Sequence, residues 1–169
     1  EQYDKLHPTG AKHNYAYHTE AMDRAMDGGI DDVGLGVLFG LNLYQYDLIG
    51  LLMHAEPLEA VHGVGPHTIS VPRIRNADDI DAESFKDAIS DELFQKIVAI
   101  LRIAVPYTGL IVSTRESKRT REMVIRYGVS QISGGSKTSV GGYAEPEEEE
   151  ENSAQFDVSD NRTLDEVVN

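Results

Sequence analysis

The stretch that decides the fold is residues 109–114, GLIVST, a short run of apolar and β-branched residues that ends in two hydroxyl side chains. Runs of this length and composition are typical of strands in a parallel sheet that is buried on both faces. Residues 91–105, just before it, have apolar side chains at helical spacing, with Ser90 placed to cap the helix and Pro106 following its end. The segment therefore predicts a helix followed by a buried strand.

The same alternation extends outward in both directions along the chain. Three more runs predict strands: 33–39 (VGLGVLF), 67–74 (HTISVPRI) and 129–133 (VSQIS). Helical spacing predicts helices at 15–26, 44–62 and 117–126, with Pro57 expected to kink or divide the second. Right-handed βα crossovers then predict an α/β fold of parallel (βα) repeats, either an open sheet or part of a (βα)8 barrel. A closed barrel needs roughly 200 residues or more, so four strands correspond to half of one.

Composition sets the expected domain boundaries and excludes several classes of function. The half-barrel is expected over residues 1–143, an acidic flexible insertion with a run of glutamates over 144–160, and a C-terminal helix that starts within 161–169 and is cut off after Asn169. Thr163 and Glu166 fit a capping box for that helix. The net charge of -14 argues against nucleic acid or an anionic membrane as partner, and no stretch resembles a signal peptide or a membrane span, so a cytoplasmic protein is expected.

Ligands of such folds bind at the carboxyl ends of the strands. After the first strand come Gly36 and Gly40, where glycines let a ligand approach the backbone or serve only for packing. Arg73 follows the second strand and Arg115 the third, each placed to hold a carboxylate or to form a surface salt bridge. The loop after the fourth strand, residues 131–136, offers hydroxyls and backbone amides to an anion. Together these strand ends predict a shared pocket.

Histidines and cysteines limit the metal chemistry of the chain. His67 precedes a strand, so it is expected at the opposite, N-terminal mouth, where capping is the plainest role, and His54 inside a helix is expected to be a core residue. No pair has the HExxH spacing of a zinc site. The absence of cysteine excludes disulfides, thiolate metal sites and a cysteine nucleophile within these residues.

Four motifs together resemble the radical-SAM tyrosine lyases of FeFe-hydrogenase maturation and, less closely, the tyrosine lyase of thiamine biosynthesis. They are DRAMDGGIDDVGLGVLFGL, VGPHTISVPRIR, IVSTRE and SQISGGSKTSVGGY. The resemblance runs from about residue 6 to 143 and again from about 163. It implies the second half of a TIM-like radical-SAM barrel, which includes the biotin and thiamin synthesis associated region.

The resemblance also implies ligand sites. S-adenosyl-L-methionine (SAM) would lie against Gly36, Leu38, Gly40, Pro72 and Arg73, although Leu38 and Leu43 replace the isoleucine and glutamate of the family's GxIxGxxE motif. Arg115, with Ser133 or Ser136, would hold the carboxylate of tyrosine. His67 matches the histidine that ligates the labile iron of the auxiliary cluster in the hydrogenase branch, with His54 as the fallback.

The resemblance implies a parent enzyme that cleaves the Cα–Cβ bond of tyrosine to p-cresol and a glycine-derived fragment, which yields CO and cyanide for assembly of the hydrogenase H-cluster. Its 4Fe-4S clusters need cysteines that would lie in an N-terminal half-barrel and a C-terminal cluster domain, so this chain alone is expected to be inactive. Two alternatives stay open at this point. One is the thiamine-branch lyase that makes dehydroglycine, and the other is a non-catalytic scaffold or binding half-barrel that self-associates through its open sheet edges.

Overall fold

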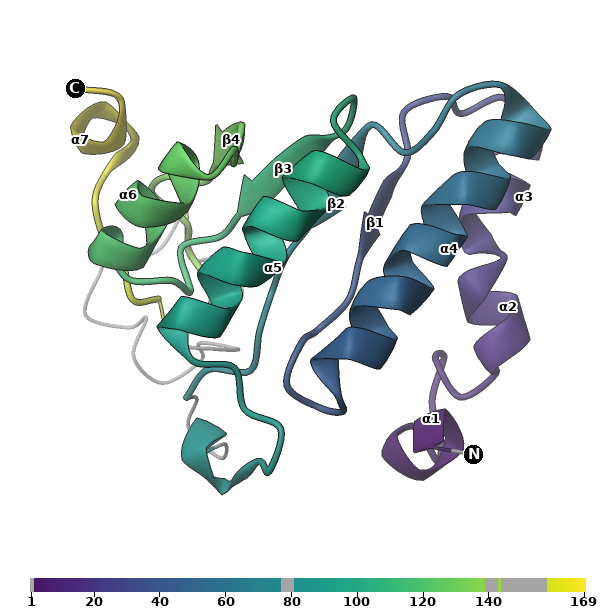
Figure 1. Cartoon of the computed structure of the whole chain (residues 1–169), viewed down its shortest axis with the longest axis horizontal. Helices are drawn as coiled ribbons and strands as arrows, with labels where there is room; N and C mark the ends of the chain where they lie inside the picture. Colours follow the sequence, from purple (N-terminus) through teal and green to yellow (C-terminus); the bar gives the residue numbers. More distant parts are fainter. Residues whose placement is uncertain (1, 77–80, 139–142, 144–157) are drawn as a thin grey trace.

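The computed structural model describes residues 2–76, 81–138, 143 and 158–169 (Figure 1). Strands β1 (Gly34–Gly36), β2 (Thr68–Ser70), β3 (Gly109–Val112) and β4 (Gln131–Ile132) alternate with helices α4 (Tyr44–His62), α5 (Asp91–Ala104) and α6 (Lys118–Arg126). The other elements precede, interrupt or follow this repeat: α1 (Gln2–Leu6), α2 (Tyr15–Thr19), α3 (Ala21–Asp27), the 3-10 helix η1 (Ala82–Ser84) and α7 (Leu164–Val168).

The four strands form one sheet in the order β1-β2-β3-β4, and every neighbouring pair is parallel. Leu35 is in register with Ile69, and Ile69 with Leu110. Each connection passes through one helix, as the alternation of short apolar runs and amphipathic segments predicts. The prediction of parallel (βα) repeats is confirmed.

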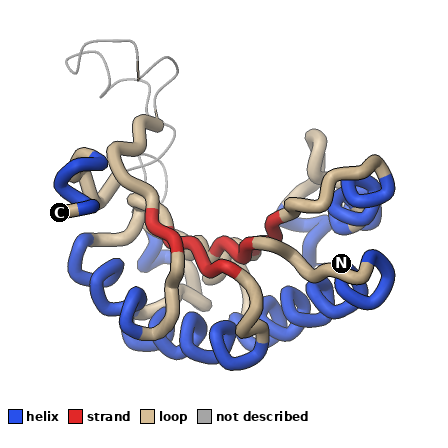
Figure 2. The backbone as a smooth tube through the Cα atoms, turned by 90° about the horizontal axis from the view of Figure 1, so that it is seen from above, coloured by secondary structure: helices blue, strands red, loops and turns tan. Residues whose placement is uncertain are grey.

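The helices α4, α5 and α6 lie along one face of the sheet, and the other face is open in the described part of the chain (Figure 2). Leu35, Ile69 and Leu110 point to the helices and are buried, whereas Gly34 and Gly36 on the opposite face are exposed. The sequence predicted strands buried on both faces. That prediction holds for the helical face only, because no described element covers the other one.

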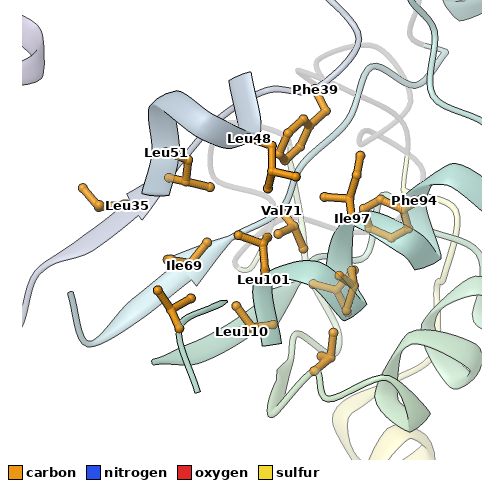
Figure 3. Packing of buried hydrophobic residues seen from close by; sticks show 14 of the residues in the cluster. Leu35, Phe39, Leu48, Leu51, Ile69, Val71, Phe94, Ile97, Leu101 and Leu110 are labelled. Carbon is orange, nitrogen blue, oxygen red and sulfur yellow. The ribbon is translucent and has the colours of Figure 1, made fainter. Parts of the chain in front are cut away.

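The core lies between the sheet and the helices (Figure 3). Helix α5 is strongly amphipathic, with Phe94, Ile97 and Leu101 all fully buried against the strands. Helix α4 adds Leu48 and Leu51. Burial of a large apolar side chain contributes roughly 2 to 3 kcal/mol, so this cluster fixes the spacing of the strands and of the residues that follow them.

Two predicted helices differ from the structure. The helix expected at 15–26 is broken at Glu20, which ends α2 and begins α3. The Thr19 hydroxyl donates back to the carbonyls of Tyr15 and Ala16, a local bond that competes with helix continuation. Pro57, in contrast, does not divide α4, which runs unbroken from Tyr44 to His62. Pro57 lies on the exposed side of α4, where water can replace the helical hydrogen bond that it removes.

The predicted helix caps are confirmed. The Ser90 hydroxyl accepts a hydrogen bond from the backbone N–H of Leu93 at the start of α5. Thr163 and Glu166 form the reciprocal capping box of α7. In the part of the chain that the structure describes, no helix is both long and apolar enough to cross a membrane.

Candidate ligand site at the carboxyl ends of the strands

The parallel order of the strands brings four segments to one edge of the sheet. These segments, called the rim below, are residues 36–40, 72–73, 113–116 and 133–136. Each begins at or within four residues of the end of its strand, and neighbouring strands run in the same direction. The sequence expectation that Gly36, Arg73, Arg115 and Ser133 reach a common edge is therefore met, while their roles toward a ligand stay predictions.

Between β1 and β2 the rim is held by backbone hydrogen bonds. The Phe39 N–H donates to the Pro72 carbonyl at 2.9 Å, and the Ile74 N–H donates to the Phe39 carbonyl at 2.9 Å. Gly40 is buried with φ +102°, a conformation that favours glycine, and a Cβ there would lie 3.5 Å from Ile74. The backbone conformation thus accounts for Gly40 without a ligand, whereas Gly36 is exposed on the open face and Leu38 is half-buried.

Arg73 is buried in an ion-pair network beneath the rim. Its Nε and Nη2 donate to the two carboxylate oxygens of Glu116 at 2.7 and 2.6 Å. Nη2 also reaches Asp91 at 2.5 Å, Nη1 donates to the Ile89 carbonyl at 2.7 Å, and the guanidinium stacks 4.6 Å from the centre of the Phe94 ring. Arg73 does bind a carboxylate through two nitrogen atoms, as predicted for its side chain, but that carboxylate is Glu116 of the protein itself.

This network is not the surface salt bridge that was the alternative prediction for Arg73. It is also not a site that is open to a ligand. Both side chains of the Arg73–Glu116 pair are almost fully buried, with 1% and 3% of their surface exposed. Burial alone would lower the pKa of Arg73, but the hydrogen bonds and charges of Glu116 and Asp91 raise it overall. That Arg73 contacts SAM stays a prediction. In the structure the N–H groups of its guanidinium donate to Glu116, to Asp91 and to the Ile89 carbonyl.

Arg115 is half-buried at the end of β3, next to Glu116. Partial burial lowers the pKa of its guanidinium, which stays protonated at neutral pH because the ordinary value is so high. Its backbone N–H donates to the Ser113 hydroxyl at 3.4 Å. Ser133 and Ser136 are half-buried in the neighbouring loop. A partly desolvated guanidinium at a strand end is suited to hold a carboxylate.

The sequence did not reveal a second buried ion pair that supports this part of the rim. Arg121 of α6 donates from Nη1 to Asp160 at 2.6 Å and from Nη2 to the Ser133 carbonyl. Asp160 also accepts hydrogen bonds from Arg162, and only 3% of it is exposed. The sequence placed residues 158–160 in the acidic insertion, but Asp160 packs against the domain. Its only sequence signal is its place just before the capping box of α7.

The acidity of Asp160 predicts how stability responds to pH. Hydrogen bonds from Arg162, together with the charge of Arg121, lower its pKa from 3.8 to about 2. Because the folded-state pKa is depressed, the stabilisation is fully present above pH 4 and is lost as the pH falls toward 2. It corresponds to roughly 2 kcal/mol. We expect the difference in unfolding free energy between the wild type and Asp160→Asn, measured with urea, to shrink by that amount from pH 5 to pH 2. A difference independent of pH would contradict this assignment.

His67 lies at the other end of the sheet, as predicted for a residue that precedes β2. Its backbone joins Val33 and Gly109, and its Nδ1 lies 3.1 Å from Asp32 Oδ1. Both side chains are exposed. This leaves Nε2 available to an outside ligand, since metal-bound histidines commonly direct their other nitrogen at a carboxylate. His54 is half-buried on α4. Among the described residues no group of three or more histidine, aspartate or glutamate side chains could hold a metal ion.

Comparison with known proteins identifies the family to which the chain belongs. Residues 70–169 match the Biotin and Thiamin Synthesis associated domain, and the chain belongs to this family. Two solved structures similar to this chain are hydrogenase maturases. One is HydG, a maturase of the [FeFe]-hydrogenase, with 55% identity, a TM-score of 0.90 and coverage of 98% of this chain. The other, HydG from Carboxydothermus hydrogenoformans, has 39% identity, a TM-score of 0.82 and coverage of 99%.

The curated relatives are two 2-iminoacetate synthases. The protein from Escherichia coli (strain K12) is 34% identical over 162 residues, and the one from Salmonella typhimurium (strain LT2) is 32% identical over 158 residues, covering 95% and 92% of this chain. The chain spans 41% of the length of each, and 35% and 37% of the two maturase chains. Its parallel four-stranded sheet matches the C-terminal part of the radical-SAM TIM barrel of these proteins.

Proposed function

We propose that this chain is the substrate-binding half of a radical-SAM tyrosine lyase and that its rim holds the carboxylate of tyrosine. The observation that carries the proposal is the position of Arg115, a half-buried cation just after β3, whose neighbouring strand β4 leads into the small-residue loop of Ser133 and Ser136. The similarity to HydG and to 2-iminoacetate synthases supports it. In this arrangement Arg115 supplies the charge and Ser133 or Ser136 a neutral donor.

The open face of the sheet has room for the body of such a substrate. Gly34 and Gly36 have no side chains there, and the neighbouring Thr68 and Ser70 are small. A Cβ added to Gly36 would lie 3.2 Å from the Ser70 carbonyl oxygen, so a larger residue would crowd the sheet. On β1 and β2 the residues of this face are small, unlike the bulky branched ones that fill most barrel interiors, and they leave space for an aromatic amino acid beside Ile111 of β3.

The residues present fit part of a SAM site. Gly36 is exposed and Leu38 half-buried at the end of β1, beside Pro72, so a ligand could approach the backbone there. Gly40 provides a turn with positive φ and Arg73 is held in the buried ion-pair network, and we propose that both support this strand end, with direct contact to SAM as a separate prediction. When bound together with a reduced 4Fe-4S cluster, SAM supplies the radical that abstracts hydrogen from tyrosine.

The clusters themselves would be held by other parts of the parent protein. The chain contains no cysteine, so it supplies no thiolate ligand, and we propose that it does not turn over by itself. His67, with Nδ1 next to Asp32, fits the role of a single nitrogen ligand from this chain to an auxiliary iron.

Two branches of the family give different products. We favour the hydrogenase branch, in which the glycine-derived fragment yields CO and cyanide, because of the 55% identity to HydG and the placement of His67. The 34% identity to a 2-iminoacetate synthase supports the thiamine branch as second candidate, since 2-iminoacetate is dehydroglycine. Assaying the parent enzyme with tyrosine and SAM separates them: p-cresol with CO and cyanide indicates the first, and p-cresol with glyoxylate from hydrolysed dehydroglycine indicates the second.

Replacing Arg115 tests the proposed carboxylate site. We expect Arg115→Ala to weaken binding of L-tyrosine about 10-fold or more, because a charge-assisted hydrogen bond contributes roughly 1.5 to 3 kcal/mol. Titration calorimetry of the chain measures the dissociation constant. Arg119→Ala is the matched control, since Arg119 is an exposed arginine in the first turn of α6, four residues after Arg115. If the two variants bind tyrosine equally well, or the wild type binds none, the carboxylate assignment loses its support.

A further inference from the structure

Residues 158–164, called the C-terminal clasp below, return from the acidic run to join the ends of β3 and β4. Figure 1 shows this segment in yellow, beside α6 and leading to α7. The backbone N–H groups of Ser159 and Asp160 both donate to the Thr114 carbonyl, at 2.9 and 3.1 Å. The Gly135 N–H donates to the Arg162 carbonyl at 3.0 Å. The clasp therefore bonds directly to the residue before Arg115 and to the loop that contains Ser133 and Ser136.

One carboxylate joins these backbone contacts to the interior. Asp160 accepts from Arg121 at 2.6 Å, and Arg121 in turn donates to the Ser133 carbonyl. Only 1% of the Arg121 side chain and 2% of the Asp160 side chain are exposed. Arg121 Nε has no hydrogen-bond partner in the described part of the chain, so the orientation of its guanidinium depends on Asp160 and Ser133. A buried cation held at so few points is sensitive to the loss of any of them.

We propose that Asp160 is a positioning residue for the substrate site: its carboxylate, through Arg121, sets the separation of the two strand ends that present Arg115 and Ser133, while its backbone N–H bonds the Thr114 carbonyl. This inference deepens the proposed function and rests on it for the identity of the ligand. It assigns to a residue beyond the acidic run a part in shaping the rim, in addition to the direct bond from the Ser133 N–H to the Val112 carbonyl. Small displacements at such a site matter because a carboxylate is recognised by paired donors at fixed spacing.

Hydrogen exchange of the chain tests the positioning step without any ligand. We expect Asp160→Asn to speed amide exchange in residues 113–116 and 133–136 about 10-fold or more, with little change in α4. Asp165→Asn is the matched control, because Asp165 is an exposed aspartate in α7 of the same terminal segment. The pair Arg121→Gln with Asp160→Asn removes both buried charges, so it keeps the test valid should the single variant unfold.

Titration with L-tyrosine then tests the consequence for binding. We expect the dissociation constant to rise about 10-fold in Asp160→Asn relative to Asp165→Asn. Unchanged exchange at both strand ends overturns the inference whatever the affinity. Faster exchange with unchanged affinity shows that the clasp is only structural and also overturns it. If the wild type binds no tyrosine, the proposed function fails, while faster exchange still supports the role of Asp160 in setting the rim.

Discussion

Replacing Glu116 by glutamine is expected to lower the free energy of unfolding by about 3 kcal/mol or more, because it leaves a buried arginine without its bidentate partner. The Arg73 guanidinium donates two hydrogen bonds to Glu116, and only 1% of its side chain is exposed. Asp91, the remaining carboxylate, is half exposed and contacts Arg73 through one oxygen. Urea unfolding followed by circular dichroism measures the change.

Glu92→Gln provides the same substitution at an exposed site on α5. Glu92 pairs with Lys96 at 3.0 Å with 81% of its side chain exposed, and such a pair contributes about 0.5 kcal/mol or less. Arg73→Met combined with Glu116→Leu is expected to recover much of the lost stability, since it removes both charges together. Equal effects of the two glutamine substitutions would show that the network beneath the rim does not stabilise the fold.

Phe94→Ala is expected to have an effect of similar size, about 3 to 5 kcal/mol. The Phe94 ring is fully buried in the core and also lies against the Arg73 guanidinium, so its removal leaves a cavity and exposes one face of the cation. The loss of stability is measured by urea unfolding. Because Phe94 and Arg73 are in contact, the effects of Phe94→Ala and Glu116→Gln should not be additive in the double variant.

Ile103→Ala, on the same helix, is the control for this prediction. Ile103 is 81% exposed, and substitutions at such sites usually change stability by about 0.5 kcal/mol or less. A comparable loss in both variants would mean that the face of α5 assigned to the core is not the one that packs on the sheet.

The sequence allowed the (βα) repeats to be predicted because periodicity is a local property. Residues 109–114 read as a strand and Ser90 as a cap, and the structure confirms both. The edge that collects Gly36, Arg73, Arg115 and Ser133 follows from parallel strand direction alone. The runs in the sequence pattern are longer than the strands, because apolar residues such as Phe39 continue past the last regular pair, and a separate bridge joins Phe39 to Arg73 beyond β1 and β2.

The chain's sequence by itself determined the alternation of strands and helices, the edge at which the predicted ligand residues gather, and the absence of thiolate ligands. Only the tertiary structure decided that Arg73 is held inside the protein by Glu116, which lies 43 positions later, and that Arg115 is half-buried after β3. It also decided that Asp160 is buried against Arg121, 39 positions earlier. Such pairings depend on where separate elements meet in space, and no periodicity along the chain encodes a contact between residues so far apart.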